Sequence, residues 1–268
     1  MKIAFIGGGN MASALIAGLV KQAGTAIHVV DPKEESLERL AQQYGASTST
    51  AIDAGVEDSD VVVLAVKPQQ MREVAAALAP HLKGQLVLSI AAGIRSVDLA
   101  RWLGGYDAIV RTMPNTPALI GMGVTGMAAQ AGVSAAQRDA ADAVMRAVGK
   151  TVWLDDEAQI DAVTGVSGSG PAYVFFFLEA MQQAAREMGL NAEQGRELAL
   201  ATFTGAAQLA AQSDETVEVL RQRVTSKGGT THAAITSMEA AGVKEAIVAA
   251  MQAAAARGQE LGEELGKD

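Results

Sequence analysis

The sequence contains no cysteine, and only 4% of its 268 residues are aromatic. The absence of cysteine excludes disulfides, thiol catalysis and cysteine-ligated metal sites, and it is typical of a reducing compartment. Alanine and glycine dominate instead, and hydrophobic residues make up 49% of the chain. A chain this apolar can bury a sizeable core, and its length predicts two domains.

Basic residues and long apolar runs are also scarce. The 21 Lys and Arg are outnumbered by 30 Asp and Glu, and the resulting net charge of −9 argues against a nucleic-acid partner. The most apolar run, residues 172–181, is too short to cross a membrane and contains Glu179. The apolar residues after Met1 and Lys2 are too few for a signal peptide. We therefore expect a soluble, cytoplasmic protein without a membrane partner or a metal site.

A glycine turn follows the first apolar segment. Residues 2–6 resemble a strand buried on both faces, and apolar residues at helical spacing begin near Asn10. Between them, Gly7-x-Gly9-x-x-Ala12 has the spacing of a dinucleotide-binding turn. Gly7 permits the tight turn, Gly9 lets the backbone approach a pyrophosphate, and the helix N-terminus supplies free N–H groups. The alternative is a turn that only connects a strand to a helix. We expect the cofactor to contact Ile6, Gly7, Gly9, Asn10 and Met11.

A carboxylate follows the next predicted strand. Asp31 follows a second apolar segment, residues 26–30, at about 20 residues from the turn, where a ribose-binding acid belongs. A carboxylate there favours NADH, because it accepts a hydrogen bond from the 2′-hydroxyl and repels the 2′-phosphate of NADPH. Lys33 can reduce that repulsion. The residues thus leave the choice between NADH and NADPH open.

Two further loops follow predicted strands. Lys67 and Pro68 follow a strand at residues 61–66, which ends at Val66, and Asn115 follows a strand at residues 108–111. Ligands of an open parallel sheet bind outside the carboxyl ends of its strands. We therefore predict that Val66, Lys67, Pro68 and Asn115 lie at the cofactor, with ordinary turn chemistry as the alternative.

The strand signals stop near Asp155, and helical periodicity takes over. We predict an α/β Rossmann domain with a doubly wound, mainly parallel sheet over residues 1–155. An all-α domain over residues 156–268 should follow it. Helices rich in alanine and glycine bury little surface alone, so we expect them to dimerise.

One loop in the helical half has the composition of a binding site. Ser226-Lys227-Gly228-Gly229-Thr230-Thr231 combines two glycines and two threonines at the start of a helix, where N–H groups and hydroxyls can bind an anion. The alternative is an ordinary N-cap formed by Thr230 or Thr231. We interpret the loop as a site for a substrate carboxylate. The adjacent His232 is expected to lie on the helix surface.

The residues after Pro171 restrict the chemistry. Hydroxyacid dehydrogenases with this layout carry a lysine and an asparagine after such a turn, whereas residues 174–177 here are Val-Phe-Phe-Phe. Alcohol oxidation therefore lacks its proton carrier. Imine reduction remains, because it requires positioning and one hydrogen bond, which the hydroxyl of Thr231 or Thr230 can donate.

Six motifs in order resemble the pyrroline-5-carboxylate reductase family: Gly7-Gly8-Gly9-Asn10-Met11, Ala65-Val66-Lys67-Pro68, Ser89-Ile90-Ala91-Ala92-Gly93, residues 111–117 (RTMPNTP), residues 165–173 (GVSGSGPAY) and residues 226–231 (SKGGTT). The resemblance covers essentially the whole chain. It implies the NAD(P)H-dependent reduction of the C=N bond of 1-pyrroline-5-carboxylate to L-proline, the final step of proline biosynthesis. It also implies a Rossmann domain and a helical dimerisation domain, with dimers often assembled into decamers.

The resemblance assigns roles to the second loop. Ser226, Gly228, Gly229 and Thr230 would hold the substrate carboxylate, and the Thr231 hydroxyl would reach the ring nitrogen. Lys227 stands where many members carry proline, and Asp31-Pro32-Lys33 departs from the Ser/Asn-Arg clusters of NADPH-preferring members. Reduction of another cyclic imino acid, or dinucleotide sensing without turnover, are the alternative functions.

Overall fold

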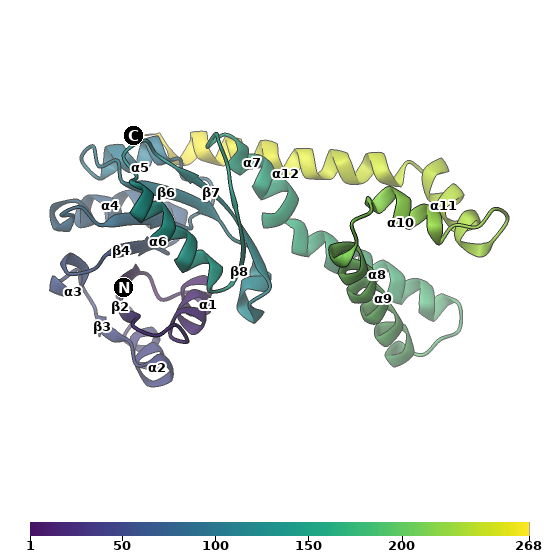
Figure 1. The fold of residues 1–268 in the computed structure, drawn as a ribbon, viewed down its shortest axis with the longest axis horizontal. Helices are drawn as coiled ribbons and strands as arrows, with labels where there is room; N and C mark the ends of the chain where they lie inside the picture. Colours follow the sequence, from purple (N-terminus) through teal and green to yellow (C-terminus); the bar gives the residue numbers. More distant parts are fainter. Residues whose placement is uncertain (268) are drawn as a thin grey trace. The chain divides into compact units, whose positions relative to one another are not determined.

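The computed structural model describes residues 1–267 and divides into two compact units (Figure 1). The first comprises Met1–Ser169 together with the chain from Gln252 onward, and the second comprises Gly170–Met251. No helix within residues 1–267 combines the length and apolarity that a membrane crossing requires.

The first unit is built on one eight-stranded sheet in the order β3-β2-β1-β4-β5-β6-β7-β8. All neighbouring strands are parallel except the antiparallel pair β6 and β7. The chain order reverses between β1 and β4, which makes their carboxyl ends a topological switch point. The predicted Rossmann fold is thereby confirmed. The strands are β1 Lys2–Ile6, β2 Ala26–Val30, β3 Ser47–Ser49, β4 Val61–Leu64, β5 Leu86–Ser89, β6 Ile109–Met113, β7 Gly123–Ala129 and β8 Gly149–Trp153.

Helices cover both faces of this sheet. α1 (Asn10–Leu19), α2 (Glu34–Tyr44) and α6 (Ala135–Arg146) pack on the face that receives Ile3 and Phe5. α3 (Ala54–Glu57), α4 (Met71–Leu78) and α5 (Ser96–Trp102) pack on the face that receives Ala4 and Ile6. Because β1 is buried on both sides, its sequence is continuously apolar rather than alternating. Burial of one large apolar side chain such as Phe5, which is fully buried, stabilises the fold by about 1.5–3 kcal/mol.

Short helical segments complete the first unit. They are η1 Pro68–Gln70, η2 Ala79–His81, η3 Thr116–Ile120, α7 Gln159–Val163 and η4 Thr164–Gly168. α12 (Val243–Leu265) contributes its second half, in which Gly258 and Gly262 are buried one turn apart. A Cβ on Gly262 would lie 3.3 Å from the Gly93 carbonyl oxygen, so the small residue allows close packing.

A buried arginine joins α7 to the sheet. The Arg111 side chain, in β6, places Nη1 3.1 Å from Glu157 Oε1 and Nη2 3.6 Å from Asp161 Oδ1. Burial raises the pKa of Asp161, and the positive charge of Arg111 opposes this effect. Arg111, from the sequence motif RTMPNTP, thus has a structural role in unit 1.

The second unit is helical and has few buried side chains. It contains α8 Gly170–Glu187, α9 Ala192–Gln212, α10 Val217–Arg223, α11 Thr230–Ala240 and the start of α12. α8 and α9 pack through the edge-on pair Phe177 and Phe203, whose ring centroids are 5.7 Å apart. Gly195 lies against Ala185, where an added Cβ would come within 2.9 Å. The helical C-terminal half is as predicted.

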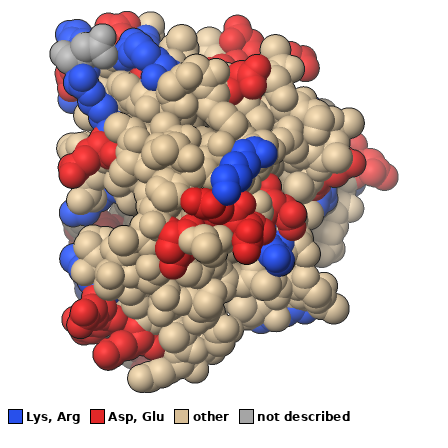
Figure 2. Space-filling view, turned by 90° about the vertical axis from the view of Figure 1, so that its left-hand side faces the viewer, with Lys and Arg blue, Asp and Glu red and all other residues tan. Residues whose placement is uncertain are grey.

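The surface charges are mixed in sign. On the face drawn in Figure 2, the basic side chains of the described residues are interspersed with acidic ones and do not form one continuous patch. This face therefore offers no extended footprint for a polyanion.

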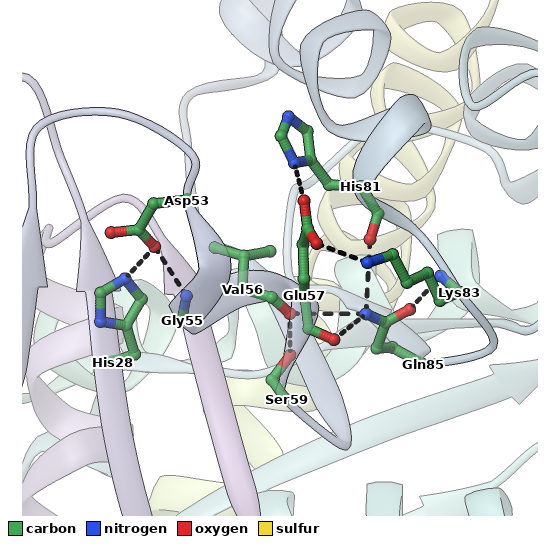
Figure 3. Close-up of polar contacts among 9 residues, drawn as sticks. All are labelled: His28, Asp53, Gly55, Val56, Glu57, Ser59, His81, Lys83 and Gln85. Carbon is green, nitrogen blue, oxygen red and sulfur yellow. Dashed lines mark hydrogen bonds and ion pairs between the residues drawn. The ribbon is translucent and has the colours of Figure 1, made fainter.

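A polar network joins the amino ends of β4 and β5 (Figure 3). Glu57 accepts hydrogen bonds from Lys83 Nζ and from His81 Nδ1, the latter at 2.9 Å. Gln85 Nε2 donates to the Glu57 carbonyl oxygen at 2.9 Å. The glycine turn follows the carboxyl end of β1, so this network lies at the opposite edge of the parallel sheet. The hydrogen bonds from Lys83 and His81 lower the pKa of Glu57 below its ordinary value of 4.5.

A lowered folded-state pKa stabilises the fold above pH 4.5, and this contribution is lost as the pH falls through the lowered value. We expect Glu57→Gln to reduce the free energy of unfolding at neutral pH, with a difference from the unmodified protein that shrinks at about pH 3. Urea unfolding at both pH values measures this. Glu73→Gln, an exposed carboxylate on α4, is the matched control and should have little effect at either pH. A Glu57→Gln difference of equal size at both pH values would contradict the assignment.

Candidate functional site

The glycine turn lies at the switch point of the sheet, after β1. Gly7 has φ +103°, and a Cβ there would lie 2.6 Å from the Ala65 carbonyl oxygen. The Gly7 N–H donates to the Val30 carbonyl at 2.7 Å, and the Ala65 N–H donates to the Ile6 carbonyl at 2.8 Å. Only glycine satisfies both the left-handed backbone and the close approach. The turn thereby brings together the carboxyl ends of β1, β2 and β4.

The start of α1 is open. Gly9 is its N-cap residue, and no side chain within residues 1–267 caps it. Gly9 and Asn10 are exposed, Met11 is half-buried, and a Cβ on Gly9 would meet no heavy atom within 4 Å. The first N–H groups of the helix are thus available to an anion that approaches the backbone closely. This geometry fits a pyrophosphate.

Asp31 is tied to the glycine turn. Its Oδ2 accepts from the Gly8 N–H at 2.7 Å, and its Oδ1 accepts from the Lys33 N–H at 2.9 Å. A carboxylate offers about four acceptor positions, so each oxygen keeps one for a ribose hydroxyl. The structure thus holds Asp31 at the end of β2 in a fixed orientation.

Arg39 is a residue that the sequence reasoning missed. Its Nη2 lies 3.2 Å from Ser13 Oγ and 3.4 Å from the Gly8 carbonyl oxygen. Arg39 lies in the middle of α2, and no local motif marks it. The only available signal is its place in the helix that follows Asp31.

Val66, Lys67 and Pro68 follow β4, next to the glycine turn. A Cβ on Gly7 would lie 3.2 Å from Val66 Cγ1. Lys67 is exposed with an extended backbone, and Pro68 begins the turn that leads into α4. These residues thus border the turn at the same edge of the sheet.

The Asn115 side chain is largely engaged inside the first unit. Its Nδ2 donates to the Ser167 carbonyl at 3.1 Å, and its Oδ1 accepts from the Val124 N–H at 2.9 Å. One Nδ2 hydrogen remains for a ligand. Asn115 therefore joins the loop after β6 to β7 and η4, and its contact with a cofactor stays a prediction.

The second group of predicted residues lies in the helical unit. Ser226 and Gly229 close a tight turn, in which the Gly229 N–H donates to the Ser226 carbonyl at 3.0 Å. Gly228 has φ +77°, and a Cβ on Gly229 would lie 2.7 Å from Ser226 Oγ. The sequence Lys-Gly-Gly thus permits a fold of the backbone that other residues would strain.

This turn leads into α11 without a side-chain cap. Gly229 is the N-cap residue, and within residues 1–267 no side chain accepts a capping hydrogen bond there. Neither Thr230 nor Thr231 caps the helix through its side chain, so the alternative interpretation of the loop as an ordinary N-cap formed by one of these threonines is wrong. Thr230 is exposed and Thr231 half-buried, while His232 is exposed, as its sequence context suggests. Hydroxyls and free N–H groups together can bind a carboxylate.

Both parts of the chain match known protein families. Residues 157–261 match a family model described as pyrroline-5-carboxylate reductase dimerisation. Residues 2–93 match a model described as NADP oxidoreductase, coenzyme F420-dependent. The pyrroline-5-carboxylate reductase of Pseudomonas aeruginosa is 49% identical over 269 residues, which cover 99% of this chain and 98% of that protein.

Solved structures are similar over the same length. The pyrroline-5-carboxylate reductase of Coxiella burnetii is 40% identical with a TM-score of 0.91, over 97% of each chain. The pyrroline carboxylate reductase of Plasmodium falciparum, solved with NADP bound, is 27% identical with a TM-score of 0.87, over 98% of each chain. Full-length identity of 49% establishes the relationship. The chain belongs to the pyrroline-5-carboxylate reductase family.

Proposed function

We propose that the chain catalyses the NAD(P)H-dependent reduction of the C=N bond of 1-pyrroline-5-carboxylate to L-proline, the final step of proline biosynthesis. The observation that carries the proposal is a pair of open helix N-termini, at α1 and α11, each entered through a glycine turn. One suits the pyrophosphate of a dinucleotide and the other the carboxylate of an imino acid. The names of the relatives support this substrate.

A nicotinamide dinucleotide would supply the hydride when bound. In our proposal its pyrophosphate lies on the N–H groups of α1, and its adenosine ribose bonds to Asp31. The NADP-bound relative supports a nicotinamide cofactor. The proposed cofactor-binding residues are Ile6, Gly7, Gly9, Asn10, Met11, Asp31, Val66, Lys67, Pro68 and Asn115.

The second loop would hold the substrate. We propose that Ser226, Gly228, Gly229 and Thr230 bind the carboxylate, and that the Thr231 hydroxyl donates a hydrogen bond to the ring nitrogen. As hydride reaches the imine carbon, the nitrogen gains basicity, so a donor at that atom stabilises the developing charge. The reduction delivers one hydride from NAD(P)H to carbon and one proton, ultimately from water, to nitrogen. Because the imine nitrogen is itself basic, no strong acid in the protein is needed.

Thr231→Ala removes the proposed donor. We expect kcat/KM for 1-pyrroline-5-carboxylate to fall about ten- to a hundredfold, the effect of losing one hydrogen bond of ~1–3 kcal/mol. The steady-state rate of NAD(P)H oxidation measures kcat/KM. Thr231→Ser keeps the hydroxyl and should retain most of the activity of the unmodified protein. Thr236→Ala removes an exposed threonine of the same helix and is the control. Unchanged kinetics in Thr231→Ala would remove this residue from the mechanism.

We further propose that residues 1–155 form the cofactor domain and residues 156–268 the substrate-binding and dimerisation domain. The family model that matches residues 157–261 supports this division. It differs from the division by compactness, because the chain from Gln252 belongs to the first compact unit. Cytoplasmic location and assembly of dimers into a decamer belong to the same proposal, and rest on the sequence and the family resemblance.

The occupant proposed for the apolar groove of the helical unit is a second copy of the chain. The groove has a volume of about 570 Å³ and is lined by aromatic and aliphatic residues of α8, α9 and α12. Phe176 in the groove is 74% exposed, and the neighbouring Phe175 is 59% exposed. Exposed large side chains gathered in one place are typical of an interface. The described dimerisation role of the matching family model supports a homodimer.

Phe176→Asp places a charge in this groove. We expect it to shift the protein from dimer to monomer at micromolar concentration, because desolvating an unpaired carboxylate opposes association. Sedimentation velocity measures the shift. Val97→Asp, at a 62% exposed apolar residue of α5, is the matched control and should leave the dimer intact. A Phe176→Asp protein that stays dimeric would place the interface elsewhere.

A further inference from the structure

Arg39 is a cation directed at the glycine turn. Both of its hydrogen bonds go to neutral oxygens, Ser13 Oγ at 3.2 Å and the Gly8 carbonyl at 3.4 Å. The side chain is exposed. A guanidinium has five N–H donors, so most of them remain available to a ligand.

The orientation of Arg39 is informative because its own helix offers acidic partners. Glu35 lies four residues before it, the spacing at which a glutamate and an arginine pair on a helix surface. None of the ion pairs among residues 1–267 nevertheless includes Arg39. Its charge is thus left without a carboxylate in direct contact.

Arg39 and Asp31 meet at the same residue. The Gly8 N–H donates to Asp31 Oδ2 at 2.7 Å, and the Gly8 carbonyl accepts from Arg39 Nη2. In a Rossmann domain, an acid at the position of Asp31 contacts the ribose 2′-hydroxyl, and a nearby arginine accommodates a 2′-phosphate. A 2′-substituent held beside Asp31 would therefore lie within reach of the Arg39 guanidinium.

We propose that Arg39 is the residue that selects a dinucleotide with a 2′-phosphate, and that it offsets the repulsion from Asp31. The ligand class is a 2′-phosphorylated adenosine, as in NADPH. Asp31 favours this arrangement, since its two backbone hydrogen bonds hold it to Gly8 and Lys33 and disperse part of its charge. The inference rests on the proposed function, because a preference for NADPH matters only to a reductase. Binding of the adenosine part can nevertheless be measured without the imine substrate.

Calorimetric titration of the full chain with 2′,5′-ADP and with 5′-AMP tests the proposal, since the two ligands differ by the 2′-phosphate alone. We expect Arg39→Ala to weaken binding of 2′,5′-ADP about ten- to a hundredfold, as for loss of a charge-assisted hydrogen bond. Binding of 5′-AMP should change less than about threefold, which also shows that the variant is folded. Arg39→Lys should weaken binding of 2′,5′-ADP by an intermediate factor. Lysine keeps the positive charge but cannot form two parallel N–H···O bonds to a phosphate.

Lys21→Ala is the control, because it removes an exposed cation just beyond the C-terminal end of α1, whereas the turn meets the N-terminal end. It should leave both affinities unchanged. Equal weakening of both ligands by Arg39→Ala would assign Arg39 a structural role and overturn the proposal. An Arg39→Ala variant with unchanged affinity for 2′,5′-ADP would also overturn the proposal. The same holds if the unmodified protein does not bind 2′,5′-ADP. Neither ligand carries nicotinamide, so these outcomes are separate from any failure of imine reduction.

Discussion

The contact between Gly7 and the chain after β4 is the constraint on which the cofactor site depends. A side chain at Gly7 would place its Cβ 2.6 Å from the Ala65 carbonyl oxygen, a distance that packed atoms do not tolerate. Because the sheet order reverses between β1 and β4, this approach brings the two carboxyl-end loops together. The same turn directs α1 so that its first N–H groups are open. Asp31 and Arg39 then reach the turn through the N–H and the carbonyl of Gly8.

Neutral backbone groups, rather than a basic surface, form both proposed anion sites of this acidic chain. The net charge is −9, yet both proposed anion sites are helix N-termini whose N–H groups carry partial positive charge. These dipoles are local and fixed by the fold, so they do not depend on the charge of the whole molecule. In a site where hydride transfer requires alignment within a fraction of an ångström, such fixed groups also need little reorganisation.

The sequence predicted the features that are local in the chain. The glycine turn, Asp31, the succession of strands and the change to helices at mid-chain are each encoded by short spacings or by periodicity, and the sheet and helical half confirm the fold class. Contacts between distant segments were not predictable in this way. Arg39 reaches Gly8 across 31 residues, and Asn115 bonds to Ser167 across 52. The packing of the end of α12 into the first unit likewise depends on Gly258 and Gly262 meeting partners far away in the sequence.

The most direct test of the proposed reaction is to follow NADPH and NADH consumption with 1-pyrroline-5-carboxylate while quantifying L-proline by chiral chromatography. The account predicts imine-dependent consumption of cofactor with one L-proline formed per hydride transferred. Cofactor binding without consumption would contradict it and favour a dinucleotide-sensing protein. Consumption only with a cyclic imine of another ring size would retain the chemistry but contradict the substrate.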